Sequence, residues 1–487
     1  MAPTEPVVIE PGGGGREGGG PGEGAGFIPS VYFADDPGNP CSADNQLPLG
    51  AASSDDLGWT CLKLFFATNR ALDDDWRNVN ASVDPADYPP NPASFFTDDR
   101  YELVARGGPF FRAFDPIADD NQMPYETYRQ GAVYVTVPKR APGDRLEAFD
   151  HEGFFGRDIH ATDKNRRESF TIQLYELLSE DAFWNAARDM KALSQRVAAE
   201  NPDWVNDSGA ALIYVHGFNA SFAGAAYRTA QLTYDLKFAG VPLFFSWPAN
   251  SEGNILKYLN DVSEGTASVG DLKAFLKDVH ERLEPTKLIV IAHSHGNQVT
   301  MNALNELSAE NPELAGMIDA MIFASPDVDA VEFKRVAERI GPIARSKTLY
   351  TSSNDRANSF RTLLTNLNPF AGDDGRKTRA GYFKRGTTPV LANGVTTIDV
   401  TNACVGSMGN EIGSNNESED NDDRLKHSKY ADARDLIRDM REMIDDLPLD
   451  PAPPPHRRLD DMVGVPSNGN ADYWRFEAQS DPDRNCG

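Results

Sequence analysis

The sequence has no long hydrophobic run. No stretch of about 18 consecutive apolar residues is present, so no transmembrane helix is predicted. The first residues, MAPTEPVVIEP, also lack the basic and apolar segments that make a secretory signal. We therefore expect either a cytoplasmic protein or an exported one whose leader is missing from the sequence.

Basic residues are scarce relative to acidic ones. The chain has 47 Lys and Arg residues against 74 Asp and Glu residues, which leaves a formal net charge of −27 at pH 7. Because a surface this acidic repels phosphate backbones, we do not expect nucleic acid as a partner.

Cysteine is also rare. The four cysteines are Cys41, Cys61, Cys404 and Cys486, and none of them belongs to a C-x-x-C pair. Structural zinc is therefore not predicted, since its sites usually draw ligands from such pairs. An even number of cysteines near the chain ends is compatible with disulfides, and hence with export, but free thiols are equally compatible. The sequence leaves both interpretations open.

Apolar material, by contrast, is sufficient for a large core, because hydrophobic residues make up 40% of the 487 residues. We expect one α/β domain over residues 58–447, with insertions near 71–130 and 366–395. A flexible Gly-rich extension is predicted over 1–57, and a Pro- and Asp-rich tail that runs over the surface is predicted over 448–487.

Short apolar runs alternate with helical patterns along the middle of the chain, which is typical of a parallel sheet covered by helices on both faces. Strands are predicted at residues 61–67, 132–137, 169–175, 211–215, 243–246, 288–292, 320–324, 347–351 and 396–400. Helices are predicted near 180–200, 222–237 and 268–283, after residue 296, and around 430–447. Ser268 and Asp271 have the spacing of a capping box at the start of the third helix.

The segment KLIVIAHSHGNQVTMNAL, residues 287–304, organises the rest of the prediction. A buried strand, a sharp turn that carries Ser294 and then a helix form the pattern of a nucleophile elbow. The usual form is G-x-S-x-G and here it is A-H-S-H-G, with Ala292 in the first glycine position. The alternative is an ordinary strand-to-helix turn in which the serine caps the helix.

A serine hydroxyl becomes an effective nucleophile when a neighbouring base takes its proton, and the base is normally a histidine oriented by a carboxylate. His427 follows the last predicted core strand and is our candidate base. Asp355 follows the strand at 347–351, before the histidine-bearing segment, and is the favoured acid. Asp327 is the alternative acid, although strand-end aspartates such as Asp327 and Asp329 also cap helices.

The candidate oxyanion hole is built from two backbone N–H groups. The segment His216-Gly217-Phe218-Asn219 follows the strand at 211–215, and its H-G step lets the N–H of Phe218 turn into the site. The second donor is the N–H of His295, the residue after the nucleophile. His216 itself is expected to be packed and hydrogen-bonded rather than to carry protons.

These segments resemble a family of bacterial esterase- and lipase-like α/β-hydrolases long catalogued as a domain of unknown function. The resemblance rests on FFATNR (65–70), IYVHGFNASF (213–222), FFSWPA (244–249), IAHSHGN (291–297), ASPDVDA (324–330), YTSSNDRA (350–357) and HSKYADA from His427. It implies an α/β-hydrolase fold with N-terminal strands and a Ser294, Asp355, His427 triad. The chain departs from many such proteins in carrying His295 where they have methionine, and in the acidic insertion before His427.

The predicted function is hydrolysis of a carboxylic ester through an acyl-enzyme, on a small-molecule or lipid-like substrate, without cofactor or metal. One alternative is a catalytically inactive hydrolase fold that serves as a binding or scaffold protein. A metal hydrolase that uses His293 and His295 is disfavoured, because Gly296 and Asn297 follow them rather than further ligands.

Overall fold

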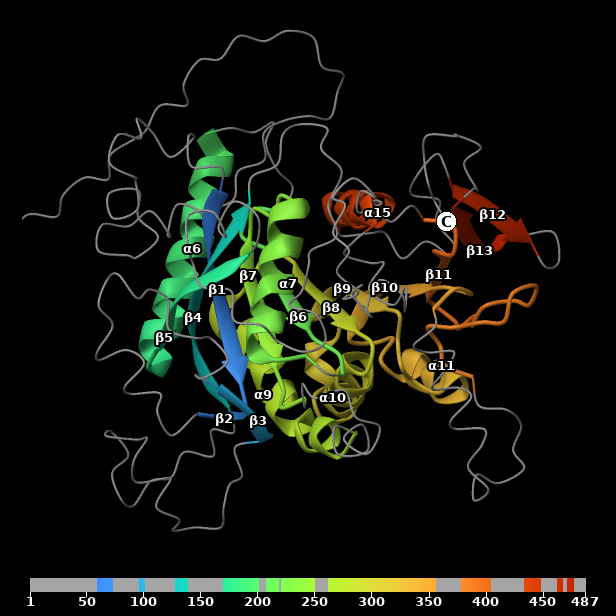
Figure 1. Ribbon diagram of the computed structural model, residues 1–487, viewed down its shortest axis with the longest axis horizontal. Coiled ribbons are helices and arrows are strands. Elements are labelled where there is room, and N and C mark those ends of the chain that lie inside the picture. Colours follow the sequence, from blue (N-terminus) through green and yellow to red (C-terminus); the bar gives the residue numbers. More distant parts are fainter. Residues whose placement is uncertain are drawn as a thin grey trace, which may run out of the picture.

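The computed structural model describes residues 59–72, 96–100, 128–138, 170–200, 207–218, 220–249, 262–355, 378–403, 433–447, 462–466 and 471–476 (Figure 1). Its principal element is one large sheet. In chain order the strands of this sheet are β1 (Trp59–Thr68), β4 (Arg129–Pro138), β5 (Thr171–Leu177), β6 (Ala211–Val215), β7 (Val241–Ser246), β8 (Leu288–His293), β9 (Ile318–Ala324), β10 (Ala344–Thr351), β11 (Thr396–Asp399), β12 (Met462–Pro466) and β13 (Ala471–Phe476). A separate small sheet pairs β2 (Arg70–Leu72) with β3 (Phe96–Arg100).

Helices alternate with these strands along the chain. They are α6 (Glu180–Glu200), α7 (Phe222–Asp235), α9 (Val269–Asp278), α10 (Gly296–Glu310), α11 (Ala330–Arg339) and α15 (Arg434–Asp445), together with the π-helical turn η4 (Val279–Leu283) and the 3₁₀ turn η5 (Pro312–Leu314). Among the described helices, none combines the length and the apolar character that crossing a membrane requires.

The sheet is mostly parallel, as predicted. Its order is β12-β13-β11-β10-β9-β8-β6-β7-β1-β4-β5. The strands from β13 to β1 run parallel to their neighbours, and the antiparallel pairs β12–β13, β1–β4 and β4–β5 close the two edges. Parallel neighbours need crossover helices, and the alternation of strands and helices in the sequence supplies them.

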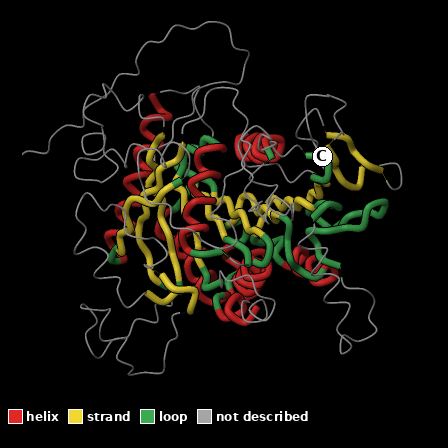
Figure 2. The backbone as a smooth tube through the Cα atoms, viewed as in Figure 1, coloured by secondary structure: helices red, strands yellow, loops and turns green. Residues whose placement is uncertain are grey.

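Helices cover both faces of the sheet (Figure 2). Side chains alternate between the faces along each strand, so Ile289 and Ile291 of β8 pack on the side of α7 and α15. Leu288, Val290 and Ala292 of the same strand pack on the opposite side, with α6, α9, α10 and α11. A strand buried on both faces must be apolar at every position, which explains the continuous run in the sequence.

The end of the chain differs from the expected surface loop. No strand is predicted after residue 400, yet β12 and β13 extend the sheet beyond β11, with Ile398 of β11 opposite Trp474 of β13. Their sequences, MVGVP and ADYWRF, contain Pro, Gly and charged residues, which weaken any local strand signal. The open edge of β11 provides the pairing partner that sequence alone does not reveal. The division of the chain into domains stays a prediction.

One of the cysteines can now be assigned. Cys61 lies buried in β1 and is disulfide-bonded to a partner outside the described residues. For this residue the disulfide interpretation holds and the free-thiol interpretation does not.

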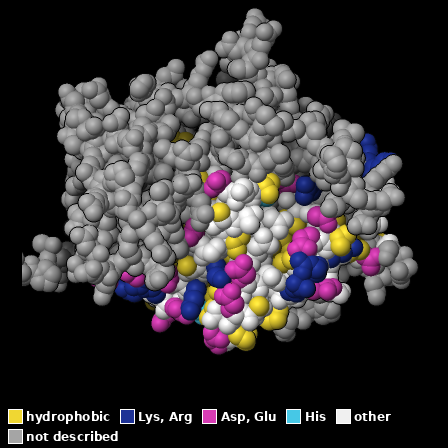
Figure 3. Space-filling model, turned by 90° about the horizontal axis from the view of Figure 1, so that it is seen from below, with side chains coloured by type: hydrophobic (Ala, Val, Ile, Leu, Met, Phe, Trp, Pro, Cys, Tyr) yellow, Lys and Arg dark blue, Asp and Glu magenta, His cyan; other side chains and the backbone are white. Residues whose placement is uncertain are grey.

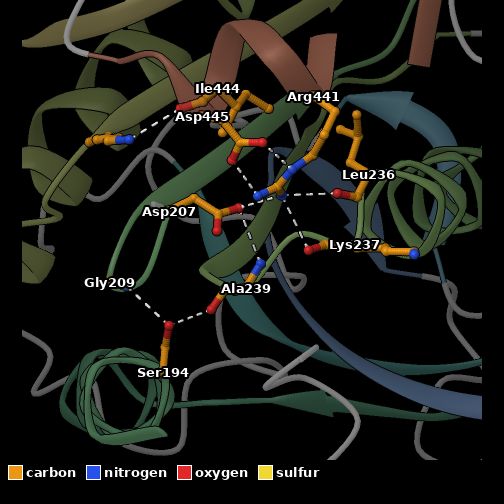
Figure 4. A network of polar contacts seen from close by, with 10 residues as sticks. Ser194, Asp207, Gly209, Leu236, Lys237, Ala239, Arg441, Ile444 and Asp445 are labelled. Atoms are coloured by element: carbon orange, nitrogen blue, oxygen red, sulfur yellow. Dashed lines mark hydrogen bonds and ion pairs between the residues drawn. The ribbon is translucent and has the colours of Figure 1, made fainter. Parts of the chain in front are cut away.

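A polar network joins α15 to the amino-terminal ends of the parallel strands (Figure 4). Arg441 of α15 donates to Asp207 Oδ2 at 3.0 Å and to the carbonyl oxygens of Leu236 at 3.0 Å and Lys237 at 3.3 Å. It also pairs with Asp445 one turn later on the same helix. Asp207 is buried before β6, and burial raises the pKa of its carboxyl although Arg441 opposes that rise.

Two further hydrogen bonds attach α15 to the strands. Lys287, just before β8, donates to the carbonyl oxygen of Ile444 at 3.1 Å. The hydroxyl of Tyr350 on β10 bonds the buried carboxylate of Asp439.

We expect Arg441→Met to lower the free energy of unfolding by about 2–4 kcal/mol, because it leaves the buried Asp207 carboxylate without its cation. Arg438→Met is the matched control on the same helix: its side chain is 53% exposed, and the expected loss is below about 1 kcal/mol. Denaturant unfolding monitored by circular dichroism measures both. Equal losses in the two variants would contradict the role assigned to Arg441.

Candidate active site

Ser294 stands in a strained turn between β8 and α10. Its φ angle is 51°, in the left-handed region that residues with a side chain seldom occupy, and its side chain is buried. The helix-capping position belongs to His295, so the alternative in which Ser294 caps α10 is wrong. The local geometry is that expected of a nucleophile elbow.

Backbone hydrogen bonds brace the elbow against the next strand, β9. The N–H of Ser294 donates to the carbonyl oxygen of Ala324 at 3.0 Å, and the N–H of Asp327 donates to the carbonyl oxygen of Ser294 at 3.0 Å. The Asn297 amide adds donations to both carbonyl oxygens, at 3.1 Å to Ser294 and 3.2 Å to Ala324. These bonds compensate for the strain at Ser294.

Two glycines allow the backbone to close around the serine. A Cβ atom on Gly296 would lie 2.3 Å from the carbonyl oxygen of His216 and 2.8 Å from that of Val215, so α10 begins in direct contact with the end of β6. A Cβ atom on Gly217 would lie 2.6 Å from the Cβ of Ser294. The loop after β6, where Phe218 is predicted to supply an oxyanion donor, therefore touches the candidate nucleophile.

The two candidate acids follow neighbouring strands. Asp327 comes after β9, beside the Ser294 strand, and Asp355 comes after β10, one strand further on. Both carboxylates are buried. His427 comes after the next strand, β11, in the chain and lies outside the described residues. The triad of Ser294, Asp355 and His427 stays a prediction.

Asp327 and Asp329 have other contacts. One oxygen of Asp327 lies 3.2 Å from Nε of Arg379, and the other lies 3.9 Å from Nδ1 of His295. Asp329 caps α11 by accepting from the N–H groups of Val331 and Glu332. The capping role considered for Asp329 is confirmed, whereas Asp327 takes part in an ion pair instead.

His216 is packed and hydrogen-bonded, as expected. Its ring stacks on Trp247 with 5.2 Å between ring centroids, and Trp247 Nε1 donates to its carbonyl oxygen at 2.8 Å. Burial, followed by the nearby Arg70 guanidinium, lowers the pKa of His216 to about 3. His216 is therefore neutral at physiological pH.

The segment Thr68-Asn69-Arg70, which runs from the last residue of β1 to the first of β2, has a role that the sequence did not reveal. Asn69 Nδ2 donates to Ser268 Oγ at 2.9 Å and to Asp271 Oδ2 at 2.6 Å. The predicted capping box of Ser268 and Asp271 is therefore wrong: Ser268 makes no side-chain cap, and both side chains accept from Asn69 instead. The only sequence signal was the polar T-N-R triplet directly after an apolar strand.

The outer surface of the α9, α10 and α11 layer carries mixed charge. Figure 3 views the molecule from below, and the described part of that face shows acidic and basic side chains interspersed. Lys273 of α9 pairs with Glu306 and Glu310 of α10 at 2.9 and 3.0 Å, and Glu332 pairs with Arg335 on α11. Such exposed pairs contribute little to stability, and this face is an ordinary solvated surface.

Comparison with known proteins agrees with this architecture. Residues 197–410 match a family described as alpha/beta hydrolase of unknown function (DUF900). The predicted resemblance and the α/β-hydrolase fold class are thereby confirmed. The match includes Phe218, Ser294 and Asp355; Arg70 precedes it and His427 follows it. No curated protein showed significant sequence similarity to the chain.

Three solved structures show a partial likeness. A Trichoderma reesei cutinase in complex with a phosphonate inhibitor is 17% identical, with a TM-score of 0.18, over 29% of this chain and 64% of that chain. Aspergillus fumigatus lipase B is 16% identical, with a TM-score of 0.24, over 41% of this chain and 47% of that chain. The catalytic core domain of a Trichoderma reesei acetyl xylan esterase is 14% identical, with a TM-score of 0.22, over 47% and 97%. The chain spans less than two thirds of the first two structures.

We expect Gly296→Ala to destabilise the protein by about 1–3 kcal/mol or more, because its methyl group meets backbone oxygens that cannot move aside. Gly270→Ala is the matched control: nothing lies within 4 Å of a Cβ atom at Gly270 in α9, and alanine there is expected to stabilise by up to about 1 kcal/mol. Unfolding midpoints measure the difference. A Gly296→Ala protein as stable as the wild type would disprove the close approach.

Proposed function

We propose that the protein is a serine carboxylic-ester hydrolase that acts through an acyl-enzyme. The observation that carries the proposal is Ser294 at positive φ, at the turn from β8 to α10, with the Gly217 backbone against its Cβ. A strained serine at the carboxyl end of a central strand, beside a loop that begins His216-Gly217, matches the requirements of acyl transfer, which needs a projecting nucleophile and nearby backbone donors.

In the proposed reaction His427 accepts the proton of Ser294 while the serine oxygen attacks the ester carbonyl. The N–H groups of Phe218 and His295 hold the tetrahedral oxyanion, and Asp355 orients the imidazole. His427 then protonates the leaving alcohol, and water hydrolyses the acyl-enzyme by the reverse sequence of proton transfers. These chain groups are sufficient for the reaction without a cofactor.

The proposed substrate class is a small-molecule or lipid-like ester. An ester is preferred to an amide because an alkoxide is a better leaving group than an amine anion. The substrate must reach a serine that is nearly covered by its surroundings, since Ser294 is 2% exposed.

Wild-type protein should hydrolyse short-chain p-nitrophenyl esters, and Ser294→Ala should reduce that rate by at least about 10⁴-fold, because it removes the hydroxyl that forms the proposed acyl-enzyme. Ser325→Ala is a matched control, since Ser325 also lies buried at a strand end with a positive φ of 44°. It should retain activity within about tenfold. If Ser294→Ala is as active as the wild type, the mechanism is wrong; an inactive but folded wild type would favour a scaffold role.

The triad acid can be identified by comparing Asp355→Asn with Asp327→Asn. We expect Asp355→Asn to lower kcat by about 10³-fold or more, because an amide cannot hold the histidine in the required tautomer. Asp327→Asn should cost less, because it weakens the contacts with Arg379 and His295 rather than the proton relay. Steady-state kinetics on folded protein decide between them, and a larger loss at Asp327 would reverse the assignment.

A further inference from the structure

We propose that Arg70 is a positioning residue that fixes the orientation of the Gly217–Phe218 peptide, and with it one donor of the oxyanion hole. This inference rests on the proposed esterase function, because it concerns how the candidate site is prepared for the oxyanion. Arg70 lies more than 140 residues before Gly217 in the chain, and no sequence motif connects the two.

Arg70 is a fully buried guanidinium that binds the loops around the site. It is the first residue of β2, and its Nε donates to Ser246 Oγ at 2.9 Å. Its other nitrogens donate to the carbonyl oxygens of Ala249 at 3.3 Å and Ala220 at 2.6 Å. The residue thus connects the end of β7, the chain after it and the loop between β6 and α7.

Two further hydrogen bonds connect Ser246 to Gly217 through His216, and in each the group nearer Arg70 is the donor. The Nδ1 of His216 lies 2.9 Å from the carbonyl oxygen of Gly217, and a carbonyl oxygen can only accept, so Nδ1 carries the proton. In the neutral ring Nε2 is then the acceptor, and it lies 3.3 Å from Ser246 Oγ. Ser246 accepts from Arg70 and donates to His216, and His216 donates to Gly217.

This series of hydrogen bonds determines which way the backbone N–H of Phe218 points. In a trans peptide the C=O and N–H groups lie on opposite sides of the unit. Once His216 holds the carbonyl oxygen of Gly217, the N–H of Phe218 must point the other way. Because Gly217 contacts Ser294, the peptide unit with this fixed orientation lies beside the nucleophile.

The charge of Arg70 also helps to keep His216 in the neutral form that accepts a hydrogen bond from Ser246. A doubly protonated His216 would have Nε2 as a donor and could no longer accept from Ser246. Burial, and then the Arg70 charge, lowers the pKa of His216 to about 3, so the accepting form persists at physiological pH. A neutral residue in place of Arg70 would remove both the hydrogen bonds and this electrostatic effect.

The loop between β6 and α7 is also held by hydrogen bonds near α7, at Ala220, and near β6, at His216. Ala220 accepts from Arg70, and Ser221 next to it caps α7 through the N–H of Gly224 at 3.0 Å. Trp247 Nε1 holds the carbonyl oxygen of His216. His216 and Ala220 are therefore both held by hydrogen bonds: Arg70 binds Ala220 directly and reaches His216 through Ser246.

The test compares Arg70→Met, which removes the donors, with Ser246→Ala, which removes only the relay hydroxyl and leaves the core volume almost unchanged. Lys287→Met is the matched control. Lys287 is a buried cation just before β8, at the end of the strand away from Ser294, and it donates to the carbonyl oxygen of Ile444. Each variant is assayed with p-nitrophenyl butyrate, and its rate is divided by the folded fraction measured by circular dichroism. Hydrogen exchange of the peptide that spans residues 216–221 is measured in parallel.

We expect kcat per folded Arg70→Met molecule to fall by about 10–100-fold, with KM changed by less than about threefold, because complete removal of one oxyanion donor costs about 10²–10³-fold. Ser246→Ala should lose about 3–30-fold on the same reasoning. The shape of the pH profile should persist, since the base is untouched. Exchange over 216–221 should accelerate in both variants and not in Lys287→Met.

An unchanged kcat per folded molecule in both variants, or unchanged exchange over 216–221 in Arg70→Met, would overturn the positioning role. A merely structural role for Arg70 would reduce the folded fraction without changing the rate per folded molecule. A wild type that hydrolyses no ester would instead refute the proposed function, and the exchange measurement would still decide whether Arg70 orders the loop.

Discussion

The structure depends on the close approach of three backbone segments around Ser294. The end of β6, the turn after β8 and the start of α10 meet at distances that only Gly217 and Gly296 permit. Within this contact Ser294 adopts the left-handed region, and Asn297 and Asp327 donate hydrogen bonds to its carbonyl oxygen. Strain at a single residue is therefore maintained by several ordinary hydrogen bonds around it.

A second set of constraints originates at β1, far from Ser294 in sequence. Asn69 holds the start of α9, and a Cβ atom on Gly265, which precedes this helix, would lie 3.0 Å from the ring of His295. Arg70 holds the loop on the other side of the serine. Asn69 and Arg70, which follow β1, thus contact elements on both sides of Ser294.

The amino-terminal ends of the parallel strands, opposite Ser294, serve a different purpose. There Arg441, Asp207 and Lys287 attach α15 across the beginnings of the parallel strands. Buried ionic groups of this kind add little net stability, but removing one partner is costly, so they favour one docked position over others. The helix that follows the candidate base is in this way fixed relative to the strand that carries the candidate nucleophile.

Much of this could be predicted from the sequence, because the signals are local. The apolar run at 288–292, the sharp turn at Ser294 and the helix after Gly296 specify a strand, an elbow and a helix wherever they occur. The repeated alternation of strands and helices was likewise enough for the parallel sheet. The capping box failed because Ser268 and Asp271 accept from Asn69, a residue about 200 positions earlier.

What the sequence by itself determined was therefore the order of elements and the identity of the candidate serine, since both depend on neighbouring residues. Only the tertiary structure decided that Arg70 reaches Ala220, that Asp327 pairs with Arg379 and that β13 continues the sheet beyond β11. The physical reason is that these contacts join residues distant in the chain. Which buried polar groups meet depends on how the strands are ordered in the sheet, and periodicity carries no information about that order.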